Sequence, residues 1–181
     1  MFPVLPVVML FSVPKCEQGV RLQTKTFLAT LFVVNSTVAA QSPAPLSVVV
    51  EGASRTVSAA ELQKLPRDTA RMVFHDAEPV TYQGVSLAGL LRTVGVRTDS
   101  LRGPALATRL VIEALDGYQV VLTLADLDPS LGGRRILLAD RVDGNALPAD
   151  EAPWRLIVTG DQRPSRSARQ VVTIRVIPES R

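Results

Sequence analysis

Cysteine and histidine, which often hold metals or act as nucleophiles, are nearly missing from this sequence. Its one cysteine is Cys16 and its one histidine is His75. After residue 40 the chain therefore has no disulfide, no thiolate metal ligand and no cysteine nucleophile. The sequence also contains no Gly-rich phosphate loop, no Cys/His metal spacing and no Ser-His-Asp arrangement. We predict no catalytic residue and no metal ligand.

Lysine and net charge are also scarce after residue 40. That part of the chain has 17 basic and 16 acidic residues, and Lys64 is its only lysine. A nearly neutral chain without a basic, aromatic-rich patch is not expected to bind nucleic acid. The bias toward arginine suits bidentate recognition of phosphate, and a GC-rich genome would produce the same bias.

No apolar run near the start of the chain is long enough for a membrane helix. The stretch 27–34 is well short of the about 20 residues that a span needs. It follows Arg21 and Lys25 and precedes small residues that end at Ala40. This order is typical of a secretory signal peptide. We therefore predict a signal peptide at 20–40, cleavage near its end, and a periplasmic or secreted protein with no membrane span after cleavage.

Residues 1–19 fit poorly into that signal peptide. They are apolar but contain three prolines, each of which disfavours a helix interior by about 3 kcal/mol. Our hypothesis is that translation starts near Val20 and that 1–19 are an extension of the gene model. The two prolines in 41–45 predict a stiff linker, and 178–181 is expected to be a short tail.

Between linker and tail, short apolar segments alternate with turn residues. Their periodicity predicts about eight strands and two or three short helices. Eight strands are expected at 46–50, 69–75, 80–84, 109–114, 118–122, 135–139, 154–159 and 170–177, and 55–57 either pairs with the first strand or extends it. The helices are expected at 59–65, 87–94 and 124–127. The segment 101–108 stays ambiguous because it contains Gly-Pro. Since strands and helices do not alternate regularly, we predict a single mixed α/β (α+β), β-rich domain over 46–177.

Capping and turn residues set several boundaries. Ser58 begins a capping box, and Ser86 precedes the second helix as its N-cap. Gly95 stands where helices often end in a left-handed residue. The dipeptide Asp116–Gly117 between two apolar runs predicts a β-hairpin.

Four segments, in order, resemble a known family. The first, Val80–Val96, is similar to the Tyr/Trp-x-Gly-Val-x-Leu-x-x-Leu-Leu-x-x-x-Gly-Val pattern of the oxidoreductase molybdopterin-binding domain, the cofactor domain of the sulfite oxidase family. The others are Val111–Tyr118, Ile136–Pro148 and Trp154–Gly160, and the last resembles the strand that leads into the family's pterin-side loop. The resemblance covers nearly all of 46–177. It implies a reduced form of that domain, and it is the only basis for molybdopterin as a cofactor.

One departure from the family bears on activity. Family enzymes hold molybdenum through a cysteine thiolate before the Tyr-x-Gly-Val segment, and 73–80 contains no cysteine. The resemblance therefore implies the fold and not sulfite oxidase-type turnover. We expect an exported accessory or subunit of a redox system, with a protein partner in the periplasm. The alternative is a non-enzymatic module that kept the fold, lost the cofactor and binds an anionic small molecule or a protein.

The first candidate site lies in the loop after the Trp154–Gly160 strand. Arg163 and Arg166, with Ser165 between them, correspond to the family's phosphate-contacting loop by resemblance. Guanidinium and hydroxyl groups suit an oxyanion. Between 160 and 175, four arginines stand against one acidic residue. The alternative interpretation is an ordinary solvated loop.

Tyr118 and His75 are two further cofactor-side candidates. Tyr118 follows the hairpin turn, where the resemblance places it near the ligand. Alternatively, its ring packs against the neighbouring strand. His75 lies where the family has its thiolate, with Asp76 beside it. Alternatively, it is a strand-end histidine in a polar turn, since a competent metal site needs at least three protein ligands.

Overall fold

The computed structural model describes residues 45–74 and 78–179. The predicted extension at 1–19 and the predicted signal peptide at 20–40 lie outside the described residues, as does most of the linker at 41–45. Within the described ranges, no helix is both long enough and apolar enough to cross a membrane.

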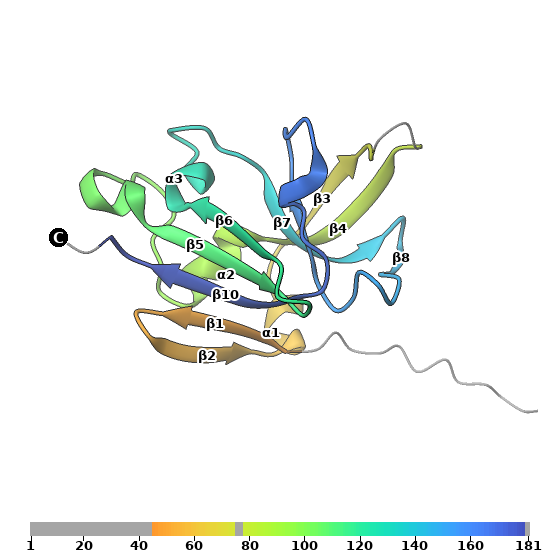
Figure 1. Ribbon diagram of the computed structural model, residues 1–181, viewed down its shortest axis with the longest axis horizontal. Helices are drawn as coiled ribbons and strands as arrows, with labels where there is room; N and C mark the ends of the chain where they lie inside the picture. Colours follow the sequence, from red (N-terminus) through yellow and green to blue (C-terminus); the bar gives the residue numbers. More distant parts are fainter. Residues whose placement is uncertain (1–44, 75–77, 180–181) are drawn as a thin grey trace, which may run out of the picture. The chain divides into compact units, whose positions relative to one another are not determined.

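The described residues contain two five-stranded sheets, and the first of them joins the two ends of the domain (Figure 1). Its strand order is β2-β1-β10-β5-β6. The strands β1 and β10 are parallel and the other neighbours are antiparallel. The strands of this sheet are β1 (Leu46–Val50), β2 (Ala53–Val57), β5 (Arg109–Ala114), β6 (Gln119–Thr123) and β10 (Val171–Ile177). The edges of this sheet are therefore β2 and β6.

The second sheet has the order β3-β4-β7-β8, and β9 also pairs with β7. Its strands are β3 (Arg67–Met72), β4 (Val80–Ser86), β7 (Ile136–Val142), β8 (Asn145–Ala146) and β9 (Arg155–Val158). The helices are α1 (Ala59–Gln63), α2 (Leu87–Thr93) and α3 (Leu124–Leu127), with 3-10 turns η1 (Gly103–Ala107) and η2 (Pro164–Arg166). This architecture confirms the prediction of a single β-rich α+β domain.

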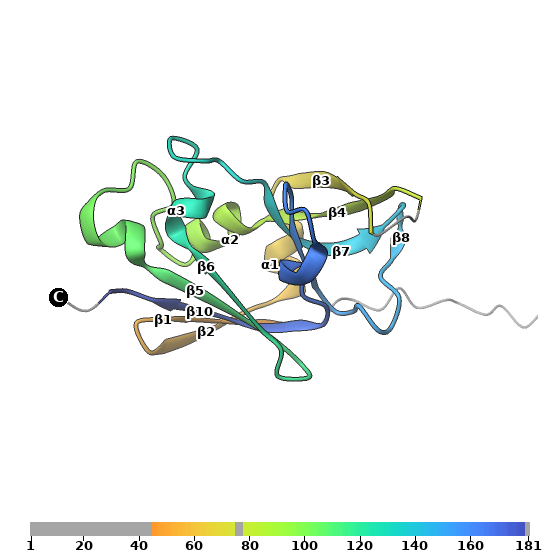
Figure 2. The same cartoon turned by 45° about the horizontal axis from the view of Figure 1, so that its top comes forward.

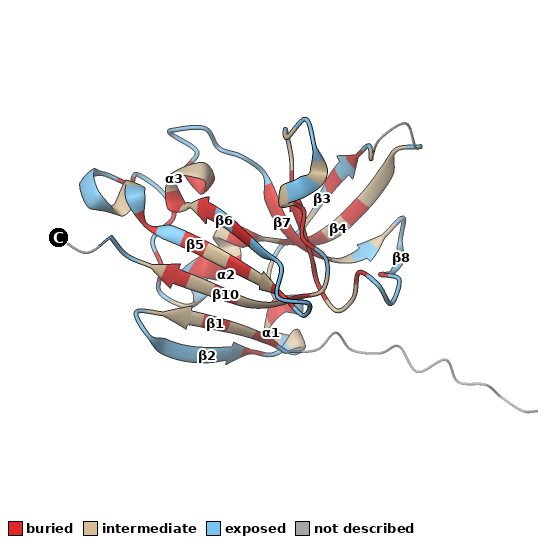
Figure 3. Ribbon diagram, viewed as in Figure 1, coloured by how far each residue is buried: buried red, intermediate tan, exposed pale blue. Residues whose placement is uncertain are grey.

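Alternation along the strands sorts the side chains into two cores (Figure 3). In β7 both faces are buried: Ile136 and Leu138 join the larger core, whereas Leu137 and Ala139 join the smaller one. The larger core combines side chains from both sheets with buried leucines of α1 and α2, and α2 contacts β4 and β7 of the second sheet (Figure 2). Each fully buried leucine stabilises the fold by roughly 1.5–3 kcal/mol, so this core holds the sheets together.

Gly84, the glycine of the Tyr-x-Gly-Val motif, lies where β4 passes close to β7. A Cβ atom at Gly84 would overlap the carbonyl oxygen of Leu138. The register between the two strands shifts at this point, between Gln83 and Gly84, which is typical of a β-bulge. Backbone packing therefore requires this glycine, independently of any ligand.

Most boundaries predicted from local chemistry are confirmed. Ser58 forms the capping box, and the hydroxyl of Ser86 accepts a hydrogen bond from the Gly89 amide. Gly95 has a φ of +85°, as expected for the residue that ends α2. The turn at Asp116–Gly117 joins β5 to β6, so the predicted hairpin forms.

Two details of the predicted strands were wrong. The strand expected at 69–75 is β3, which begins at Arg67 because this residue pairs with Val85 and its guanidinium binds Asp140 on β7. The described residues contain ten strands rather than about eight. One of those missed is β8, whose two residues carry no hydrophobic pattern and are set by the preceding turn. The ambiguous segment 101–108 contains η1.

Candidate functional site

The arginine loop, defined as Gly160–Arg169, joins β9 to β10 and is fixed at its base. Gly160 has a φ of +84°, a left-handed conformation that lets the chain turn out of β9. The buried Ser167 hydroxyl accepts a hydrogen bond from the Val158 amide at 3.1 Å. Between these points, η2 presents an exposed Ser165. The loop is therefore held by the sheet while its middle remains accessible.

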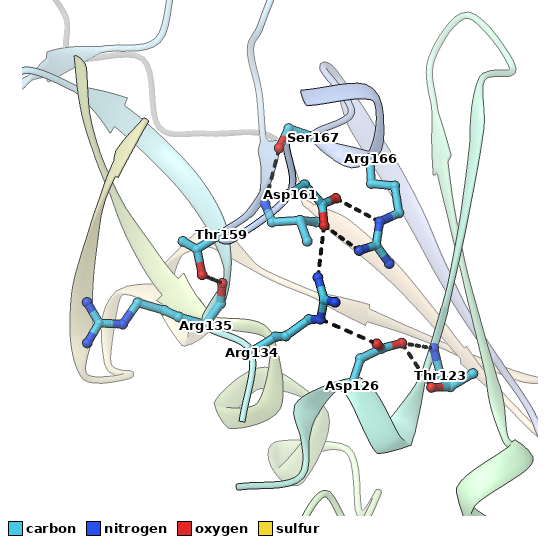
Figure 4. Close-up of polar contacts among 9 residues, drawn as sticks. Thr123, Asp126, Arg134, Arg135, Thr159, Asp161, Arg166 and Ser167 are labelled. Atoms are coloured by element: carbon cyan, nitrogen blue, oxygen red, sulfur yellow. Dashed lines mark hydrogen bonds and ion pairs between the residues drawn. The ribbon is translucent and has the colours of Figure 1, made fainter. Parts of the chain in front are cut away.

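Asp161 is the centre of the charge network in the arginine loop (Figure 4). Arg166 donates to this carboxylate from Nε at 2.7 Å and from Nη2 at 2.5 Å. Arg134, which lies just before β7, donates from Nη1 at 2.9 Å. The Arg166 hydrogen bond is the main reason that the pKa of Asp161 is lowered. The same bond raises the pKa of Arg166. Both partners are therefore held in their charged forms.

Two contacts connect the arginine loop to the hairpin formed by β5 and β6. Nε of Arg134 lies 3.9 Å from Asp126, whose carboxylate accepts hydrogen bonds from the backbone amide and hydroxyl of Thr123 at the end of β6. At the start of β6, the Tyr118 hydroxyl donates to the Ser165 carbonyl at 2.8 Å. The hairpin thus positions the loop at both ends of the edge strand.

The three arginines of the loop differ in how far they are neutralised. Arg166 is held by Asp161. Arg169 pairs with Asp150 at 3.1 Å, in a solvent-exposed contact that contributes little energy. Arg163 is exposed, and its guanidinium makes no hydrogen bond or ion pair with any residue in the described part of the chain. Arg163 is therefore the loop cation that is open to an external anion.

Tyr118 lies beside the arginine loop and borders a shallow cavity. Its side chain remains 48% exposed, and its hydroxyl contacts η2 rather than a neighbouring strand. The cavity has a volume of about 350 Å³ and is lined by Tyr118, Arg169, Ser167, Asp116 and Asp150, among others. The structure therefore brings together Tyr118, Ser165 and Arg166, three of the residues chosen from sequence.

His75, the remaining candidate from sequence, lies outside the described residues. Across 45–74 and 78–179, no group of three or more His, Cys, Asp or Glu side chains could hold a metal ion. The chain has no cysteine after Cys16, so its donor set does not fit a molybdenum centre of the thiolate type.

Sequence reasoning missed a second polar cluster, which is buried beside the smaller core. The Arg155 guanidinium is 4% exposed and donates to the Tyr82 hydroxyl at 2.8 Å and to the Glu151 carboxylate. It also stacks on Phe74, 4.6 Å from the ring centre. Burial is the main reason that the pKa of Tyr82 is raised to about 12. This cluster fixes the start of β9, from which the arginine loop follows.

Comparison with known proteins supports the fold. No family model matches the sequence, and no curated protein matches it. Among solved structures, the chain is similar to the sulfane dehydrogenase SoxCD from Paracoccus pantotrophus, with a TM-score of 0.59 and 17% sequence identity. The match covers 75% of this chain and 38% of that one. The described domain is therefore similar in fold to part of that dehydrogenase, and it spans well under half of the matched chain.

Proposed function

We propose that this domain is an oxyanion-binding module that uses the arginine loop and has no sulfite oxidase-type turnover of its own. The observation that carries the proposal is the exposed guanidinium of Arg163, which is unpaired within the described residues and lies two positions before the exposed Ser165. A guanidinium presents a planar fork of N–H donors that matches phosphate or sulfate oxygens. The lack of any cysteine after Cys16 supports binding without redox chemistry.

The proposal also covers the compartment in which the protein acts and the ligand or partner that it meets there. The signal-peptide pattern at 20–40 favours a periplasmic or secreted protein. The fold relation favours an accessory or subunit of a redox system, with molybdopterin as one phosphate-bearing ligand to be tested. A protein partner is the second candidate function, because Leu115, Tyr118 and Val121 are large apolar side chains left exposed on the hairpin.

A calorimetric titration of the purified protein with sulfate and with a phosphate monoester tests the proposal. We expect weak saturable binding at low salt that fades at high salt, because exposed charges are screened within about 10 Å at 0.1 M ionic strength. Arg163→Ala should weaken binding at least about fivefold, since it removes the unpaired cation.

Arg102→Ala is the matched control, because Arg102 is also exposed and makes no ion pair or hydrogen bond from its guanidinium in the described chain. It should leave binding unchanged. Equal losses of anion affinity in the two variants would mean that the total charge of the protein, and not the arginine loop, determines binding. Wild-type protein that gives no heat at low salt would contradict the proposal and favour the protein-partner function.

A further inference from the structure

The carboxylate of Asp161 occupies a place that an external oxyanion would otherwise fill. It lies between two guanidinium groups, Arg134 and Arg166, and accepts three hydrogen bonds from them. Its side chain is only 12% exposed, whereas those of Arg134 and Arg166 are 41% and 35% exposed. Two convergent guanidinium forks are the arrangement that recognises sulfate or phosphate.

We propose that Asp161 is an internal competitor that holds the Arg134–Arg166 fork closed, and that a tetrahedral dianion binds by displacing it. This inference rests on the proposed oxyanion-binding function. It adds Arg134 and Arg166 to Arg163 as ligand groups and assigns Asp161 the role of setting affinity.

Displacement is compatible with the local structure. In the described part of the chain, the Asp161 side chain makes hydrogen bonds only to these two arginines. Asp161 directly follows Gly160, whose φ of +84° marks a backbone position with access to conformations that other residues avoid. Part of each guanidinium already faces solvent. A dianion can therefore approach from outside while the carboxylate rotates away.

Displacement of the Asp161 carboxylate should favour ligands with two negative charges over ligands with one. Arg134 and Arg166 face two aspartates, Asp126 and Asp161, so the charges at the site balance while Asp161 is in place. A monoanion that replaces a carboxylate gains no electrostatic energy, whereas a dianion gains one further charge interaction. Sulfate and phosphate should therefore bind in preference to chloride or acetate.

The test compares sulfate binding by wild-type protein, Asp161→Asn and Asp99→Asn in calorimetry at low salt. Asparagine keeps the size of the side chain and removes the competing charge. We expect the Kd for sulfate to fall about tenfold in Asp161→Asn, a difference of about 1.4 kcal/mol. Asp99→Asn is the matched control, because it makes the same change in net charge at an exposed pair with Arg97, outside the arginine loop. It should change the Kd less than about twofold.

The outcomes separate this inference from the proposed function. If wild-type protein binds sulfate and Asp161→Asn binds it no more tightly, the competitor role is wrong while oxyanion binding stands. If neither wild-type protein nor Asp161→Asn binds sulfate, both the competitor role and the oxyanion-binding function are wrong. Equal tightening in Asp161→Asn and Asp99→Asn would also overturn the competitor role, because net charge alone would explain it.

A measurement on wild-type protein covers the case in which Asp161→Asn does not fold. The Nε–H resonance of Arg166 reports its hydrogen bond to Asp161. Sulfate titration should move this resonance with the same Kd as calorimetry and leave the Nε–H of Arg102 in place. A resonance of Arg166 that stays fixed while sulfate binds would show that Asp161 is not displaced.

Discussion

Replacing Glu151 with glutamine removes the negative charge that balances the buried guanidinium of Arg155. Glu151 is 8% exposed and Arg155 is 4% exposed, and Arg155 also lies against the rings of Phe74 and Tyr82. Nε of Arg155 has no hydrogen-bond partner among the described residues. Glutamine can still accept a hydrogen bond, so the substitution isolates the loss of charge from the loss of contact.

The expected cost follows from burial. Removing one partner of a buried ion pair costs about 3–5 kcal/mol, because the remaining charge stays out of water without compensation. Since glutamine retains one acceptor, we expect the lower end, about 3 kcal/mol in the free energy of unfolding. For a domain of this size that loss lowers Tm by roughly 10 °C.

Urea unfolding followed by tryptophan fluorescence measures this cost. Trp154 is the only tryptophan, is 1% exposed and directly precedes Arg155. The neighbouring substitution Asp150→Asn is the control, because Asp150 is exposed and should lose less than about 0.5 kcal/mol. A loss below about 1 kcal/mol for Glu151→Gln, which is the range of exposed ion pairs, would refute the reasoning.

Two other stability predictions follow. The pKa of Asp161 is lowered in the folded chain, so its contribution is complete above its ordinary pKa of 3.8 and is lost as the pH falls through the lower folded value. The difference in free energy of unfolding between wild type and Asp161→Asn should therefore be smaller at pH 3 than at pH 7. An equal difference at the two pH values would contradict this. Gly84→Ala should cost about 3 kcal/mol or more in urea unfolding, because the added methyl group overlaps Leu138. A cost under about 1 kcal/mol would mean that the β-bulge adapts.

Features set by neighbouring residues could be predicted from sequence. The capping box at Ser58, the end of α2 at Gly95 and the Asp116–Gly117 hairpin each depend on a few adjacent residues, and all three form. Four ordered motifs also pointed to the fold that structural comparison supports. By contrast, β8 has no hydrophobic pattern and exists because a turn returns the chain to β7.

The charge network of the site could not be predicted, because its partners are far apart in sequence. Arg134 and Asp161 are separated by 27 positions, and Arg155 and Tyr82 by 73. The sequence marked Arg163, Arg166, Ser165 and Tyr118 as candidates but gave no reason to treat Arg166 differently from Arg163. Only the folded chain shows that Asp161 neutralises one of these arginines and leaves the other open.

The measurement that tests the central claim most directly is the calorimetric titration of wild-type protein and Arg163→Ala with sulfate at low and high salt. Oxyanion binding at the arginine loop predicts a saturable isotherm for the wild type at low salt, at least about fivefold weaker binding for the variant, and loss of binding at high salt. A flat isotherm for the wild type at low salt, or identical isotherms for the two proteins, would contradict it.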